Sequence, residues 1–357
     1  MAQSWAGEWL TSPDPLLKAV LDVWSSRALA AGQQLGVFAE LGKGPRTAAR
    51  LADTLGLALA AARDLLDALL ALGWLQREGD DERAVYVSTR TGAHFLDPRS
   101  PAYLGDLLMA ARSPWVGPQD AALDEALRAN AAPPGEAATA PPEAWETAGM
   151  LMRQRLGSLY GKALAHQFPA DGMASTILDL HGEGARLACA WATHAGRGQT
   201  ITSLQRPGQL PAAMAHVQAC GLASRVRLLA VEPAGPQPPG EAQPFRAAPH
   251  DIVVLSLLLE PGGAVRRRAR LQHAVRELAP GGRLLVLEHL ADDARRHHAA
   301  ALVLGLAGRM TAQGHGVITE GELRQDCRDC GLQDIDCLAL PGGASVLVTR
   351  QPRVEGA

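Results

Sequence analysis

The hydrophobic pattern of the chain changes near residue 175. Before that point, apolar residues recur at the three- and four-residue spacing of amphipathic helices. This spacing predicts helices at 15–31, 34–41, 46–57, 60–72, 103–111, 120–129 and 143–167. Between the fourth and fifth of these, Gly73–Ser88 predicts a β-hairpin with a charged tip. Helices followed by a hairpin in this order predict a winged-helix arrangement at the front of the chain.

After residue 175, short apolar runs alternate with helical segments. The runs predict strands at 176–180, 200–204, 226–231, 252–258, 283–288 and 345–350. The segments between and beyond them predict helices at 186–195, 211–220, 264–278, 295–308 and 319–330. Such alternation is typical of a doubly wound parallel sheet. The fold class predicted is therefore α/β, with an N-terminal winged-helix, mostly helical domain followed by a doubly wound Rossmann-like domain.

The expected domain boundaries follow from these patterns. A winged-helix domain is predicted over 14–100 and a sheet domain over 171–351. A helical connector over 101–170 contains an Ala- and Pro-rich stretch at 131–142, which predicts a surface loop.

Composition narrows the class of protein. The 357 residues are 47% hydrophobic with a net charge of −3, so no basic field would attract nucleic acid. The candidate recognition helix at 60–72 carries Arg63 but also Asp64 and Asp67, which favours packing and dimerisation over binding to DNA. No apolar run is long enough for a membrane span, and five cysteines favour a reducing cytoplasm.

One cysteine motif raises the question of a metal. Cys327 and Cys330 form a Cys-x-x-Cys pair, and Cys337 follows. A structural zinc site needs four ligands, and this pair lies in a helical pattern instead of a knuckle turn. The sequence therefore predicts no metal site.

Two longer motifs carry a family resemblance. Residues 276–288 read Arg-Glu-Leu-Ala-Pro-Gly-Gly-Arg-Leu-Leu-Val-Leu-Glu, and residues 221–226 read Gly-Leu-Ala-Ser-Arg-Val. With the winged-helix front, they resemble the small-molecule O-methyltransferases of the caffeate and acetylserotonin type. The resemblance implies S-adenosylmethionine as cofactor, a small hydroxylated metabolite as substrate, and a homodimer held by the N-terminal helices.

The family's cofactor loop reads Asp-x-Gly-Gly-Gly-x-Gly, and the matching residues here are 179–185. Three of its four glycines are replaced, by His181, Glu183 and Ala185. Side chains at such positions obstruct close approach of a ligand to the backbone. Gln205 stands where the family has the acid that binds the ribose. The resemblance assigns cofactor contacts to Asp179, Gly182, Gly184, Gln205 and Glu232.

Two side chains are candidate bases. Glu260 takes the position of the family's catalytic His, where burial could raise its pKa toward neutrality. His289 follows a predicted strand, at the edge where α/β folds bind ligands. The substrate pocket is expected to include Trp145, Met150 and His315.

Two hypotheses remain open from these residues. In the first, the protein is an S-adenosylmethionine-dependent methyltransferase with altered cofactor contacts. In the second, the fold has lost methyl transfer, and the protein is a different biosynthetic enzyme, of cyclase or decarboxylase type, or a non-catalytic partner.

Overall fold

A computed structural model describes residues 14–79, 83–111, 142–169, 175–196, 198–231, 249–257, 263–308 and 317–352. The chain divides into two compact units, Met1–Met109 and Ala110–Ala357. Within the described ranges, every helix is too short or too polar to cross a membrane.

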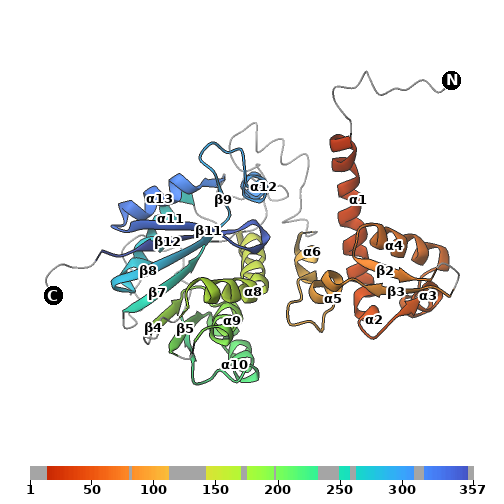
Figure 1. Ribbon diagram of the computed structural model, residues 1–357, viewed down its shortest axis with the longest axis horizontal. Coiled ribbons are helices and arrows are strands. Elements are labelled where there is room, and N and C mark those ends of the chain that lie inside the picture. The colour runs from red at the N-terminus through yellow and green to blue at the C-terminus, as the bar shows by residue number, and fades with distance from the viewer. Residues whose placement is uncertain are drawn as a thin grey trace, which may run out of the picture. The chain divides into compact units, whose positions relative to one another are not determined.

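The N-terminal unit has the predicted winged-helix arrangement (Figure 1). Its helices are α1 (Asp14–Leu35), α2 (Val37–Leu41), α3 (Ala48–Leu55), α4 (Leu59–Ala71), α5 (Arg90–Leu96) and α6 (Gly105–Ala111). Its strands are β1 (Arg46–Thr47), β2 (Leu75–Glu78) and β3 (Val85–Ser88), paired in the order β1-β3-β2. Thr47 caps α3 by accepting the amide N–H of Arg50, and Gly56 ends that helix in the left-handed conformation.

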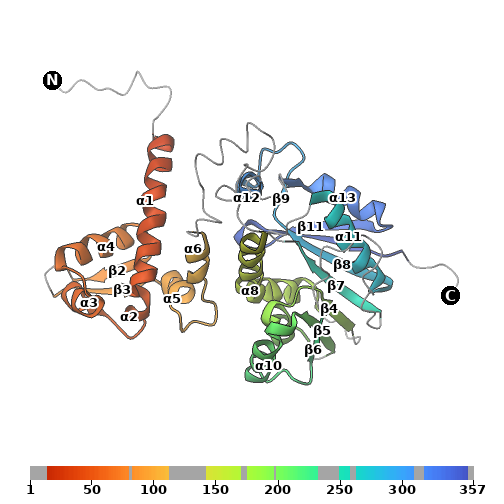
Figure 2. The same cartoon turned by 180° about the vertical axis from the view of Figure 1, so that it is seen from behind.

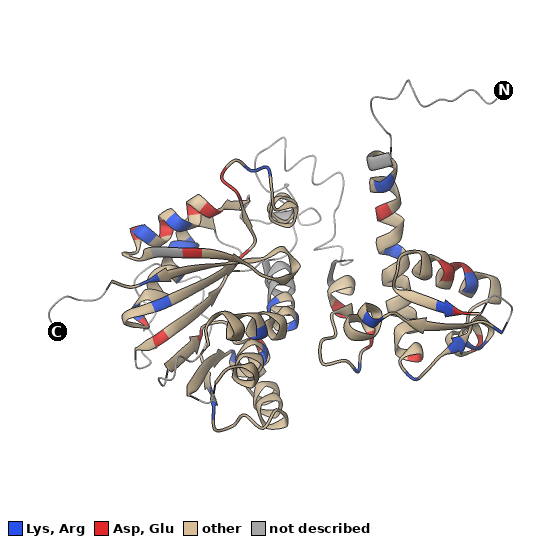
Figure 3. Ribbon diagram, viewed as in Figure 1, with Lys and Arg blue, Asp and Glu red and all other residues tan. Residues whose placement is uncertain are grey.

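The candidate recognition helix α4 packs against the β-hairpin of the same unit. Acidic and basic positions lie beside each other on it (Figure 3). The Tyr86 hydroxyl donates to Asp67 at 2.6 Å, and Arg77 lies 3.6 Å from the same carboxylate. These contacts tie α4 to the hairpin, because both partners come from β2 and β3. Binding to nucleic acid, which the charge pattern disfavours, gains no support from this helix.

The C-terminal unit is built on a seven-stranded sheet, shown from both sides in Figures 1 and 2. Its strands are β4 (Ser175–Asp179), β5 (Gln199–Gln205), β6 (Val226–Ala230), β7 (His250–Ser256), β8 (Leu278–Glu288), β11 (Gln333–Ala339) and β12 (Ser345–Arg350). The order is β11-β12-β8-β7-β4-β5-β6, in which β4 to β8 are parallel and β12 is antiparallel to both neighbours. The predicted Rossmann-like fold is confirmed.

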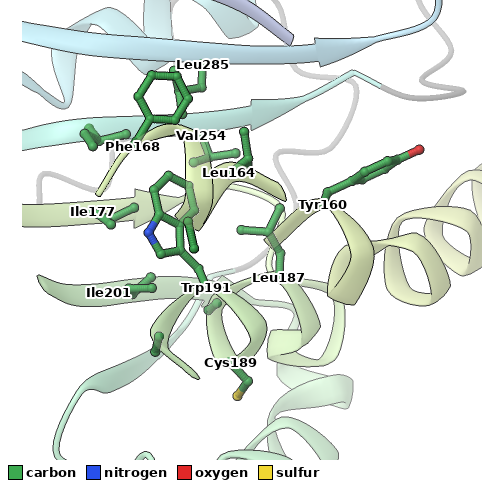
Figure 4. Packing of buried hydrophobic residues seen from close by; sticks show 14 of the residues in the cluster. Tyr160, Leu164, Phe168, Ile177, Leu187, Cys189, Trp191, Ile201, Val254 and Leu285 are labelled. Carbon is green, nitrogen blue, oxygen red and sulfur yellow. The ribbon is translucent and has the colours of Figure 1, made fainter. Parts of the chain in front are cut away.

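Helices cover both faces of this sheet because successive strand residues point to opposite faces. Ile177 packs in the core beneath α8 (Pro142–Gln167), α9 (Arg186–His194) and α10 (Leu210–Ala219), shown in Figure 4. Its neighbour Leu178 packs in the other core, beneath α11 (Gly263–Arg276) and α13 (Glu320–Asp329).

Some predicted boundaries were wrong. Strand β11 was not predicted, and neither was the short pair β9 (Leu290–Ala291) and β10 (Ile318–Thr319). Helix α12 starts at Ala299, not at Arg295, because Arg295 and His298 have positive φ. The helix predicted at 120–129 lies outside the described residues. So does the loop predicted at 131–142, except for its last residue.

Candidate functional site

The candidate site lies where the strand order of the sheet reverses. From β4, the chain adds β5 and β6 on one side and then returns to place β7 on the other. The carboxyl ends of β4 and β7 therefore flank the switch point, the usual ligand crevice of such folds. Asp179 ends β4, Ser256 ends β7 and Gln205 ends β5.

The loop after β4 folds tightly against β5. Gly182 donates its amide N–H to the Leu204 carbonyl at 3.0 Å, and a Cβ at Gly182 would overlap the Ser203 hydroxyl. Gly184 and Ala185 both have left-handed φ, of 68° and 56°. Ala185 stands where the resembled loop has its last glycine, so the strained backbone is retained at a cost of about 1–2 kcal/mol.

The Gln205 side chain holds this loop in place through hydrogen bonds. Its Nε2 donates to the Gly182 carbonyl at 2.6 Å and to the Ser203 hydroxyl at 3.0 Å. Its Oε1 accepts the Gly184 amide N–H at 3.1 Å. Both ends of the buried amide are therefore engaged by the protein itself.

Asp179 is buried beneath the loop. Its carboxylate accepts the Ser203 hydroxyl at 2.8 Å and the His181 amide N–H at 3.3 Å. Burial raises the pKa of Asp179 to about 6, although both hydrogen bonds oppose that shift, and the nearby Glu183 adds to it. The carboxyl group therefore titrates near neutrality.

A buried ion pair joins the loop to α8. The Arg153 guanidinium donates to Glu183 Oε1 from Nε at 3.2 Å and from Nη2 at 3.0 Å. Each side chain is only 5% exposed. The negative charge that Glu183 brings into the loop is thus balanced by Arg153, at a site where an unpaired charge would be costly.

His181 completes the polar cluster. Its Nε2 lies 2.8 Å from Arg270 Nη1 on α11. Arginine can only donate, so Nε2 accepts and the ring is neutral. Burial, together with the positive charge of Arg270, holds the pKa of His181 well below its usual value.

A small hollow, open to solvent, adjoins these groups. It is lined by Arg153, Gly157, Tyr160, His181, Gly182, Glu183, Leu187, Ser256 and Leu287. The Tyr160 and Ser256 hydroxyl oxygens are buried and have no hydrogen-bond partner among the described residues. The Tyr160 hydroxyl points away from the apolar cluster that holds its ring (Figure 4). Buried hydroxyls on a hollow can hydrogen-bond a polar ligand or a water molecule that enters it.

His289 lies just after β8, the strand that contributes Leu287 to the hollow. Its Nδ1 lies 3.1 Å from the Gly343 carbonyl, which can only accept, so Nδ1 carries the proton. Nε2 then presents a lone pair, and it is buried without a partner among the described residues. Burial lowers the pKa of His289, so the ring is neutral at pH 7.

Some of the predicted site residues are described by the structure, and others lie outside the described residues. Asp179, Gly182, Gly184 and Gln205 come together in one hydrogen-bonded network. Met150 lies 2.7 Å from Gln209 Nε2 through its sulfur. Glu232, Glu260 and His315, together with the side chain of Trp145, lie outside the described residues.

Several site residues were not predicted. Ser203 and Ser256 lie at or near the carboxyl ends of predicted strands, so the strand pattern could have indicated them. Arg153 and Tyr160 belong to a long helix whose local sequence gives no sign of the loop it contacts.

Comparisons with known proteins agree with this arrangement. Residues 17–98 match the O-methyltransferase dimerisation domain. The chain is 29% identical over 354 residues to the tetracenomycin polyketide synthesis 8-O-methyl transferase of Streptomyces glaucescens, covering 96% of this chain and 97% of that protein. It is 28% identical over 348 residues to the 3-hydroxy-5-methyl-1-naphthoate 3-O-methyltransferase of Streptomyces sahachiroi, covering 94% of each.

A solved structure extends the likeness to the whole fold. Human N-acetylserotonin methyltransferase, determined in complex with S-adenosylmethionine, superposes with a TM-score of 0.74 at 20% identity. The match covers 97% of this chain and 99% of that one. The resemblance to the small-molecule O-methyltransferases is confirmed.

Proposed function

We propose that this chain, a relative of the small-molecule O-methyltransferases along almost its whole length, methylates a hydroxyl group of a fused aromatic metabolite with S-adenosylmethionine. The observation that carries the proposal is the hollow at the switch point of the sheet. It is lined by a buried ion pair and by two hydroxyls that find no partner within the described part of the chain. The substrate class is taken from the tetracenomycin and naphthoate relatives.

The residues of the hollow fit the amino-acid end of the cofactor. That end carries one carboxylate and one ammonium group. To bind them, Arg153 and Glu183 must share or exchange the hydrogen bonds that they make to each other. The unpartnered hydroxyls of Tyr160 and Ser256 add two further hydrogen-bonding groups.

The ribose position departs from the family. Gln205 lacks a carboxylate, and its amide already bonds the loop. A ribose hydroxyl that binds there must compete with the hydrogen bonds between Gln205 and the loop. We therefore infer that Gln205 binds the ribose more weakly than an acidic residue would.

His289 is the proposed base. When bound, the cofactor's sulfonium supplies an electrophilic methyl group. The neutral Nε2 of His289 takes the proton of the substrate hydroxyl, while Nδ1 stays bonded to Gly343, so the ring keeps its orientation. Because the pKa of His289 is lowered, the base form persists below pH 6.5.

A second candidate function is loss of methyl transfer. It is favoured by the self-contained bonding of Gln205 and by the side chains at three glycine positions of the loop. The chain would then bind a similar metabolite in a different reaction, or act without catalysis beside an active relative.

The test is methyl transfer from radiolabelled S-adenosylmethionine to 3-hydroxy-1-naphthoate and related phenols. His289→Ala should lower kcat by about 10²–10⁴-fold, the usual contribution of a general base. His297→Gln, at an exposed position, is the matched control and should keep wild-type turnover. Equal turnover in all three proteins would remove His289 from the mechanism, and no transfer by the wild type to any of the phenols would favour the second candidate.

We also propose that the chain forms a homodimer through its N-terminal unit. The match to the dimerisation domain supports this. So does helix α1, whose Leu17, Leu21 and Trp24 are 54%, 62% and 64% exposed. They recur at helical spacing and form one apolar stripe, which a partner subunit would cover.

A further inference from the structure

Three metal-binding side chains converge away from the hollow. Cys189 lies on α9, His216 lies on α10, and Cys220 caps the end of α10. One ligand atom from each lies within 4.8 Å of the others. The Cys220 sulfur is 3.9 Å from either ring nitrogen of His216.

These distances suit a soft or borderline metal ion. Zinc binds thiolate sulfur at about 2.3 Å and imidazole nitrogen at about 2.0 Å, so ligand atoms of a tetrahedral site lie roughly 3.5–3.8 Å apart. Small side-chain movements would close the present cluster to that geometry. His216 and Cys220 are four residues apart on one helix, which places them on the same face.

We propose that Cys189, His216 and Cys220 bind one zinc ion, with water as the fourth ligand. Two thiolates and one imidazole are a ligand set that zinc uses with an open position. Cys189 is buried while Cys220 is exposed, so the ion would lie at the surface with access from solvent. The Cys189 sulfur points away from the packed apolar cluster (Figure 4).

This cluster is not the one that the sequence motif suggested. Among the described residues, Cys327, Cys330 and Cys337 do not form such a group of three. The proposed site joins residues 27 and 31 positions apart in sequence, on two helices whose contact no local pattern reveals.

The ion would hold together two helices that support the candidate site. Helix α9 starts directly after the loop at 182–185, and α10 packs against that loop. Zinc between them would restrain the loop that Gln205 fastens. The proposal does not depend on methyl transfer, because it concerns only these two helices.

Cobalt(II) titration of the reduced full-length protein tests the site, because thiolate ligands give cobalt a charge-transfer absorption. We expect one cobalt per chain, displaced by zinc. Cys220→Ser and His216→Gln should each weaken cobalt binding more than about tenfold. The matched controls Cys330→Ser and His194→Gln should bind cobalt like the wild type.

Circular dichroism melting of each variant shows that it is folded before titration. Both ligand variants are chosen at positions that are not fully buried. Absence of the charge-transfer band in the folded wild type would overturn the proposal. The same affinity in Cys220→Ser would also overturn it, as would a Cys189–Cys220 disulfide that persists under reducing conditions.

Discussion

At the scale of single residues, the site depends on charges that are buried in pairs. Arg153 and Glu183 are each 5% exposed, and removing either partner leaves an uncompensated charge. Such a loss costs about 3–5 kcal/mol, whereas replacing both partners with apolar side chains of similar volume is often neutral. A double substitution is therefore the way to remove this pair while keeping the fold.

Asp179 should make stability depend on pH. Its pKa is raised from 3.8 to about 6 on folding, so the folded state binds the proton more tightly. The stabilisation is complete below the unfolded pKa and is lost as pH rises through about 6, with a total of roughly 3 kcal/mol. In urea denaturation, the free energy of unfolding is measured for the wild type and for Asp179→Asn. The value for the wild type minus the value for the variant should fall between pH 4 and pH 7.

Asp292 provides a control of opposite sign. Hydrogen bonds from the backbone N–H groups of His297 and Arg296 lower the pKa of Asp292. Its contribution to stability is present above the unfolded pKa and is lost in acid. The free energy of unfolding of the wild type minus that of Asp292→Asn should therefore rise with pH. An Asp179 difference that is constant or rises with pH would contradict burial as the dominant cause.

At the scale of elements, close contact between α8 and α9 brings Arg153 and Tyr160 to the loop. Gly161 makes that contact possible, since a Cβ there would overlap the Leu187 carbonyl oxygen. A Cβ added at Gly157, one turn earlier, would lie 3.1 Å from Leu187 N at the start of α9. The two glycines of α8 therefore set the distance between this helix and the site.

Gly161→Ala should destabilise the protein by about 1–3 kcal/mol, because the overlapping atom is backbone and cannot rotate away. The gain in helix propensity, about 1 kcal/mol, offsets part of that cost. Gly208→Ala is the matched control, since a Cβ at Gly208 meets open space. Thermal melting compares the two variants with the wild type. Equal melting temperatures would show that α8 and α9 can move apart to accept the added methyl group without loss of stability.

The sequence predicts the elements best where burial is complete. Strands β4, β7 and β12 each contain an unbroken run of apolar or β-branched residues, and all three were predicted. Strand β5 was predicted too, although Ile201 and Leu204 stand among polar residues there. Strand β11 was missed because Asp334 and Asp336 interrupt its apolar pattern, as charges often do on a sheet edge.

The candidate site was predictable only in part. The loop at 179–185 and Gln205 follow from the resemblance and from strand ends. The Arg153–Glu183 pair spans 30 residues, and the cysteine–histidine cluster spans two helices, so both need the tertiary packing. Nothing in the local sequence could indicate that Gln205 bonds the loop instead of leaving its amide for a ligand.

At the scale of the whole molecule, the apolar stripe on α1 should be covered by a second copy. Leu17→Glu with Leu21→Glu should shift the protein from dimer to monomer in sedimentation velocity, because burying two carboxylates at an apolar interface is costly. Ser26→Glu, on the opposite side of the helix, should leave the dimer intact. A dimer that survives the double substitution would show that α1 is not the interface.

The central claim is that the hollow binds S-adenosylmethionine, and that its amino-acid end pairs with Arg153 and Glu183 in exchange for part of their mutual ion pair. Isothermal titration calorimetry on the full chain tests it most directly. The wild type should bind one cofactor per chain, and Arg153→Met with Glu183→Leu should bind about 10–100-fold more weakly, because two charge-assisted contacts are lost. Absence of binding by the wild type at millimolar cofactor, or equal affinity in the folded double variant, would contradict the claim.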